Sequence, residues 1–184
     1  LPQEDELDNL EYSARLKKIF WRQFNMKSRK TSIQSADLTG RNVQTVLDRA
    51  LLNSNAFAFD WISGNIYYST YYSVDKRRSG AANMVSNIFV SRVDGTFITE
   101  VVDTNPGEIQ GIVVSPLEGM LFWNDRNVDN ETIKSARMDG TQVEELAVFR
   151  TEPLKKMIAS LIYDYKRKRL MWFNQKLKAI QTWD

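Results

Sequence analysis

The sequence contains no cysteine and no histidine. Without cysteine, the chain can form no disulfide framework, no thiolate nucleophile and no cysteine-type zinc site. Without histidine, it can form no Ser-His-Asp triad and no histidine-ligated metal site. Most hydrolase and zinc mechanisms are therefore excluded, whereas carboxylate chemistry stays open.

The sequence also lacks long apolar runs and an excess of one charge. Its longest apolar stretches, such as Ile112–Val114 and Met120–Trp123, are far shorter than the roughly 18 to 20 residues of a membrane-spanning helix, so we expect no membrane contact. The 25 basic and 23 acidic residues leave a formal net charge of +2, which gives no reason to expect a nucleic-acid partner. The one dense basic run, Lys166–Arg169, is interpreted as a solvated turn, with a phosphate-binding or nuclear-targeting patch as the alternative.

The length of 184 residues, 42% of them hydrophobic, is sufficient for one domain with a sizeable core. The sequence begins at Leu1 with an acidic stretch that does not resemble a signal peptide. We therefore expect the chain to be a piece of a longer protein.

What the sequence does contain is an internal repeat. Each copy has a short apolar run, a polar residue, a turn and a second apolar run that ends in a large aromatic residue. The polar and the aromatic residue are eight positions apart in three copies, Asp60 to Tyr68, Ser115 to Trp123 and Asp164 to Trp172, and an earlier copy keeps Ile19–Trp21. A second motif follows, in which a Gly-containing turn lies between two apolar runs, as expected for a hairpin: Ile33–Gly40, Ile88–Gly95 and Ile133–Gly140.

The spacing of the aromatic residues predicts the fold class. Trp21, Tyr68, Trp123 and Trp172 are 47, 55 and 49 residues apart, and each unit has room for about four short strands. Such a period is typical of β-propeller blades, so we predict an all-β protein with helix at most near Glu11–Lys18. We expect the four aromatic residues to pack between neighbouring blades. The alternative is a stacking platform for the bases or sugar rings of a ligand.

These motifs resemble the YWTD (class B) repeats of the low-density lipoprotein receptor family over roughly Lys18–Asp184. The third copy matches best, with Phe122–Asp125 where the family has Tyr-Trp-Thr-Asp. The resemblance implies a partial six-bladed propeller of four-stranded blades. Residues 18–184 would supply about three and a half blades, and residues 1–17 would be a linker or the end of a preceding blade. It also implies that the acid of the motif, here Asp125 with Asn174 as a near substitute, ties adjacent blades together.

The resemblance implies binding and not catalysis, with no cofactor. Propellers of this family occur beside cysteine-rich modules in lipoprotein receptors, co-receptors for secreted signals, basement-membrane proteins and receptor kinases. We expect the ectodomain of an endocytic, lipoprotein-receptor-like receptor, on the extracellular side of the cell membrane or secreted. Its partners would be protein ligands, lipoproteins or neighbouring modules of the same receptor. A signalling co-receptor or receptor kinase is the alternative, and the long polar segment Thr70–Ser86 is a candidate binding loop.

Local patterns leave three further possibilities. The acids and amides of residues 125–131 are spaced like a calcium loop, but Asn130 and Ala136 stand where an EF-hand requires Gly and Glu, so we predict a solvated loop. The same loop carries a sequon for N-glycosylation at Asn130. Asp60 and Asp164 recur at one blade position and are the candidate pair for a carboxylate-dependent propeller hydrolase, although we favour a structural role at a strand end.

The absence of histidine bears on any release of a ligand in acid. Histidine is the usual switch near pH 6.5, whereas carboxylates titrate near pH 4. We therefore expect this segment to contribute little to such a switch, unless burial raises the pKa of a carboxylate such as Asp125.

Overall fold

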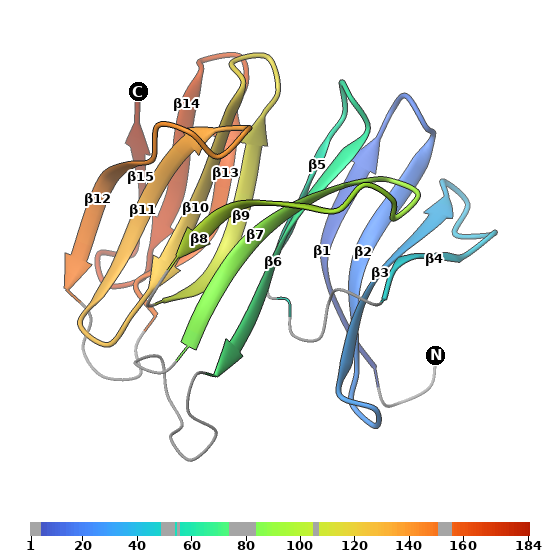
Figure 1. Cartoon of the computed structure of the whole chain (residues 1–184). Coiled ribbons are helices and arrows are strands. Elements are labelled where there is room, and N and C mark those ends of the chain that lie inside the picture. Colours follow the sequence, from blue (N-terminus) through green and yellow to red (C-terminus); the bar gives the residue numbers. More distant parts are fainter. Residues whose placement is uncertain (1–4, 49–53, 55, 74–83, 105–106, 151–155) are drawn as a thin grey trace.

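The computed structural model describes residues 5–48, 54, 56–73, 84–104, 107–150 and 156–184. Every regular element in these residues is a β-strand, and the strands form four antiparallel sheets that stand side by side as propeller blades (Figure 1). The described residues contain no helix that is long and apolar enough to cross a membrane. The predicted all-β class and the arrangement in blades are confirmed.

Each blade is a meander in which consecutive strands are hydrogen-bonded. The first blade contains β1 (Asp5–Ser13), β2 (Lys18–Asn25), β3 (Lys30–Asp37) and β4 (Gln44–Leu47). The second contains β5 (Phe57–Asp60), β6 (Asn65–Ser73), β7 (Met84–Arg92) and β8 (Thr99–Thr104). The third contains β9 (Glu108–Ser115), β10 (Met120–Arg126), β11 (Asn130–Arg137) and β12 (Glu144–Arg150). The fourth contains β13 (Ile158–Asp164), β14 (Arg169–Asn174) and β15 (Ala179–Trp183).

The structure corrects our boundary after residue 17. Strand β1 pairs with β2 and is the first strand of the first blade, and no helix forms near Glu11–Lys18. The signal was present in the sequence, because Ser13 lies eight residues before Trp21, as in the other copies. The pairing of β1 with β2 is irregular between Asp8 and Glu11, and this interrupts the alternation of apolar and polar residues. The sequence pattern therefore did not indicate the strand.

The recurring polar residue before each aromatic residue closes the first turn of its blade. The Asp60 carboxylate accepts hydrogen bonds from the backbone N–H groups of Ile62 at 2.9 Å and Ser63 at 3.2 Å. Asp164 accepts two such bonds, and the Ser13 hydroxyl accepts one. The turn ends at a residue with positive φ, which Gly64 adopts at 78° without steric cost. The eight-residue spacing therefore reflects one turn geometry used in every blade.

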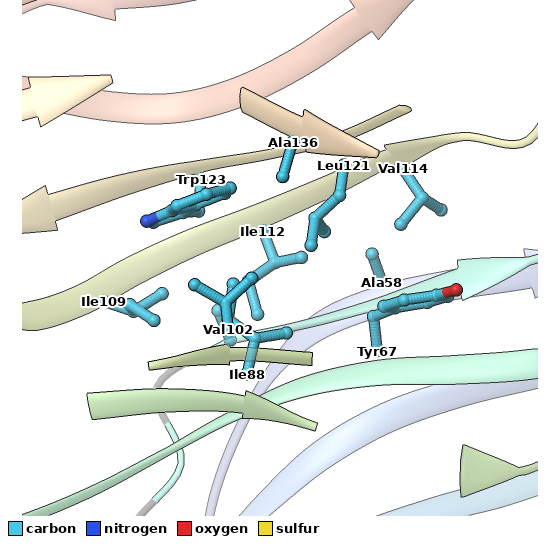
Figure 2. Close-up of a cluster of buried hydrophobic side chains, with 11 residues drawn as sticks. Ala58, Tyr67, Ile88, Val102, Ile109, Ile112, Val114, Leu121, Trp123 and Ala136 are labelled. Atoms are coloured by element: carbon cyan, nitrogen blue, oxygen red, sulfur yellow. The ribbon is translucent and has the colours of Figure 1, made fainter. Parts of the chain in front are cut away.

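The apolar core is divided into three clusters, one at each junction between consecutive blades. Figure 2 shows the middle cluster, in which Trp123 and Leu121 of the third blade face side chains of the second blade such as Ile88. Fully burying an aliphatic or aromatic side chain contributes about 1.5–3 kcal/mol, so the junctions hold the blades together. The predicted loop Thr70–Ser86 is shorter than expected, since β6 and β7 extend into it, and its residues 74–83 lie outside the described part of the chain.

Candidate binding surface

The four aromatic residues of the repeat occupy equivalent places on β2, β6, β10 and β14. Trp123 and Tyr68 are fully buried, and Trp172 is buried, each in the cluster shared with the preceding blade. Trp21 is only half-buried, because it lies on the face of the first blade that has no described neighbour. The three buried rings present no open face on which a ligand ring could stack.

Asp125 lies at the passage from the second blade to the third. Its carboxylate is buried, accepts a hydrogen bond from Lys134 Nζ at 2.8 Å and packs against Gly107, where any side chain would collide with it. At the same place in the fourth blade, the side-chain oxygen of Asn174 accepts the N–H groups of Lys176 and Leu177 and closes a turn. The two residues therefore make different contacts, although the repeat aligns them.

A buried carboxylate that the sequence analysis considered only as part of a calcium-like loop ties two blades together. Glu131 of β11 is fully buried, and its side chain accepts a hydrogen bond from Asn124 Nδ2 at 2.8 Å. It also accepts the backbone N–H groups of Met157 at 2.7 Å and Ile158 at 3.1 Å, where the chain enters the fourth blade. The equivalent residue of the second blade, Ser86, likewise accepts a backbone N–H group at the start of the third blade.

The loop at 125–131 is a turn closed by its own side chains. The Asn127 side chain accepts the N–H groups of Asp129 at 3.0 Å and Asn130 at 2.8 Å. Nowhere in the described ranges do three acidic side chains gather as they would around a metal ion. Asn130 is partly exposed at the start of β11. The basic run Lys166–Arg169 spans the turn between β13 and β14.

Asp60 and Asp164 do not form an acid–base pair, because both carboxylates are used by their own turns. Backbone and side-chain hydrogen bonds from Arg167 lower the pKa of Asp164. A general acid requires the opposite shift, toward neutral pH.

The first strands of the four blades surround a central channel. Its cavity of about 670 Å³ is lined mainly by residues of β1, β5, β9 and β13, together with Asn124 of β10 and Gln175 after β14. The lining includes the charged residues Glu11 and Lys156 and two tyrosines, Tyr163 and Tyr165. Such a concave site with few convergent polar groups is the usual form of a binding pocket.

Glu11 of β1 is an unusual carboxylate in this channel. Burial raises its pKa to about 7, because the charged form is poorly hydrated there. No residue in the described part of the chain donates a hydrogen bond to it or pairs with it. Glu11 therefore differs from Glu131, whose burial is compensated by three donors.

Tyr165, which lines the channel, meets an aromatic side chain of another blade that lines a second cavity, and we call the place where they meet the channel mouth. Trp61, in the first turn of the second blade, contacts Tyr165, in the first turn of the fourth, edge to face with ring centroids 4.6 Å apart. The Tyr165 hydroxyl donates to the carbonyl of Val114 at 3.0 Å, which fixes the ring against the third blade. Burial and the negative charges of Glu11, Glu118 and Asp60 raise the pKa of Tyr165 to about 12. Trp61 and Tyr165 are 104 positions apart in the sequence, and sequence reasoning therefore did not predict this contact.

The end of the blades that carries the first turns, at the top of Figure 1, is rich in exposed apolar side chains. We call this end, with the neighbouring third turns of the blades, the turn face. Its exposed apolar residues are Leu16, Leu38, Val43, Ile62, Phe97, Ile98, Leu117, Val143 and Tyr165. Phe97 is 72% exposed at a φ of 54°, which bulky residues rarely adopt, and the Arg92 guanidinium lies 4.1 Å from its ring centre. Concentrations of exposed apolar residues mark interaction sites.

The chain is similar to known proteins in sequence and in fold, although no family model matches it. The vitellogenin receptor Yl of Drosophila melanogaster is 26% identical over 164 residues, which are 89% of this chain and 7% of that receptor. A chain in the structure of a nidogen/laminin complex is 26% identical, with a TM-score of 0.72 over 91% of this chain and 56% of that one. Oligogalacturonate lyase in complex with manganese has a TM-score of 0.60 over 98% of this chain and 54% of the lyase, and its 12% identity shows the fold alone.

The four blades define the chain as a segment of a β-propeller. The repeat motifs, together with the similarity to the vitellogenin receptor and to the nidogen/laminin structure, support a YWTD (class B) repeat propeller like those of the low-density lipoprotein receptor family.

Proposed function

We propose that the chain is the ligand-binding part of a six-bladed propeller in the ectodomain of an endocytic, lipoprotein-receptor-like receptor, and that it binds proteins or lipoproteins through the turn face. The observation that carries this proposal is the concentration of exposed apolar side chains, including Phe97, at the end of the blades where the channel opens. The positive φ of Phe97 belongs to the turn and not to a function, since Asn42 and Gln142 adopt 55° at the same position of their blades, and what distinguishes Phe97 is a large apolar side chain that is left exposed.

The outer faces of the first and fourth blades favour a ring that contains further blades, because apolar side chains are exposed on both. Leu10 of the first blade is 71% exposed, whereas Phe57 at the same place in the second is 1% exposed. On the opposite face, Ile180 of the fourth blade is 66% exposed, whereas its equivalent Ile133 is fully buried. These apolar side chains are the ones that pack at the inner junctions, so further blades on either side would bury them.

The relatives support a protein partner in an extracellular setting. One relative is a receptor for vitellogenin by its name, and the other was solved in a complex of nidogen with laminin. Asp125 packs against the entry to the third blade, which fits a role in holding blades together. A hydrolytic function has no support, because Asp60 and Asp164 are both engaged in turns.

The experiment is a binding assay on the purified chain with immobilised lipoprotein particles, vitellogenin and laminin as probes. We expect Phe97→Asp to weaken binding of the recognised probe at least tenfold, since it places a charge on the proposed contact. The matched control is Leu177→Asp, an exposed apolar residue in a turn at the opposite end of the blades. Equal effects of the two substitutions, or binding of none of the three probes, would overturn the proposal.

A further inference from the structure

The channel mouth combines two features that favour a positive charge. The first is the Trp61–Tyr165 pair, whose rings come from two turns and remain partly exposed. The faces of such rings carry partial negative charge and attract ammonium and guanidinium groups. The second is a set of three carboxylates near Tyr165. The negative charges of Glu11, Glu118 and Asp60 all raise the pKa of the Tyr165 hydroxyl.

Among these carboxylates, Glu11 alone has no hydrogen-bond or ion-pair partner in the part of the chain that the structure describes. Asp60 is held by the N–H groups of its turn, and Glu118 lies 3.7 Å from Lys168 Nζ. Glu11 lines the channel beside Tyr165, with no hydrogen bond or ion pair from any described residue. A carboxylate removed from water without compensation is unfavourable, and a cation that reached it would restore a charge-assisted hydrogen bond.

We propose that the channel mouth binds a lysine or arginine side chain presented by a protein ligand, with Trp61 and Tyr165 packing on its stem and Glu11 accepting from its charged head. The inference rests on the proposed function, because it assumes a protein ligand on the turn face. It deepens that function by naming the residue type that enters the channel. Long cationic side chains suit the site, since they bury an apolar stem and carry the charge at its end.

Lys156 is the one cation among the described residues that line the same cavity, and it makes no ion pair with Glu11 there. Lys156 is exposed and precedes β13, next to Met157 and Ile158, whose N–H groups bind Glu131. Among the described interactions, none joins Lys156 to Glu11. Among the described residues, none therefore occupies the Glu11 carboxylate.

The test uses Nα-acetyl-lysine methylamide as the probe and Nα-acetyl-norleucine methylamide as its uncharged match. Binding is followed by NMR through the Trp61 indole and Tyr165 ring signals, because the chain has five tryptophans and bulk fluorescence would mix them. We expect the lysine probe to shift both signals saturably and the norleucine probe to bind about tenfold more weakly, as expected for the loss of one charged hydrogen bond. Glu11→Gln, which keeps the size of the side chain, should remove this difference, and the exposed control Glu144→Gln should leave it unchanged.

Equal affinity for the two probes, no saturable shift, or an unchanged lysine preference in Glu11→Gln would overturn the cationic site. The failure of this site is distinguishable from failure of the proposed function. If the lysine probe does not bind while Phe97→Asp still weakens binding of the protein probe, the turn face stands and the channel mouth does not take a cation.

Discussion

Two regions of the molecule each contain a carboxylate away from bulk water: the junction between the third and fourth blades, and the mouth of the channel. They differ in the number of hydrogen-bond donors that the carboxylate meets. At the junction, Glu131 is fully buried and three donors saturate its oxygens. At the channel, Glu11 is less buried and has no donor in the described part of the chain. A polar group whose hydrogen bonds are all made fixes a structure, whereas one left open is free to meet a ligand. The comparison assigns stability to the junctions and recognition to the mouth.

The largest effect should come from the apolar part of a junction. We expect Trp123→Ala to lower the free energy of unfolding by roughly 3–5 kcal/mol, since it empties a large, fully buried site. Trp21→Ala, at the equivalent place on the half-buried outer face, should cost much less. Thermal and denaturant unfolding of both variants measure this difference. Equal losses would mean that the junctions are not what holds the blades together.

The next effect concerns the junction carboxylate. Glu131→Gln replaces one acceptor oxygen by an NH₂ group, which faces donors from either Asn124 or the backbone of the fourth blade. We expect a loss of about 2 kcal/mol, because a buried donor is left unsatisfied. Chemical denaturation gives the value. An unchanged stability would contradict the role of Glu131 as the tie between these blades.

A substitution of the carboxylate at the channel mouth should raise the stability of the fold instead of lowering it, and the size of this effect should depend on pH. The pKa of Glu11 is about 7 in the folded chain and near 4.5 when unfolded, so the folded form keeps its proton longer. Stability should therefore fall as pH rises from about 4.5 to 7, and Glu11→Gln should remove this fall. The tyrosines of the channel, with pKa values raised by burial, do not titrate in this window.

We expect Glu11→Gln to raise Tm at pH 8 by roughly 2–4 °C, if about 1 kcal/mol of the desolvation penalty is recovered, and to leave it unchanged at pH 4. Calorimetry at the two pH values is the measurement. A lower Tm at pH 8 would show that the Glu11 carboxylate stabilises the fold through a contact of its own.

The smallest effect on stability is expected from a modification. When the protein is secreted from animal cells, Asn130 should carry a glycan, because it lies partly exposed in a turn. Asn130→Gln should then change the mass of the secreted chain and leave its unfolding almost unaltered. Mass spectrometry that finds Asn130 unmodified in all molecules would count against secretion or against access to this turn.

The fold could be predicted from the sequence because the blade is a local unit repeated four times. The eight-residue spacing from Asp60 to Tyr68 reflects one turn, and the aromatic residue that follows it recurs on the face toward the preceding blade. The strand β1 was missed because its irregular pairing breaks the period on which the prediction depended. Charged residues such as Glu6 and Asp8 made it look like a linker.

The site could be predicted much less well, because it depends on contacts between different copies of the repeat. Nothing in the positions of Trp61 and Tyr165 indicates that their rings meet, since each lies in a turn of variable sequence. Glu131 was treated as part of a calcium-like loop, and its bonds to Met157 and Ile158 follow only from the stacking of the blades. Asp125, which the motif singled out, has its ion pair with Lys134 in its own blade.

One measurement tests the division between the two regions most directly: Tm and lysine-probe affinity, determined in parallel for Glu11→Gln and Glu131→Gln at pH 8. The account predicts opposite patterns. Glu11→Gln should lose about tenfold in affinity and keep or raise Tm, whereas Glu131→Gln should lower Tm and bind the probe like the unmodified chain below its melting temperature. A Glu11→Gln variant that melts earlier and binds the lysine probe with full affinity would contradict the account.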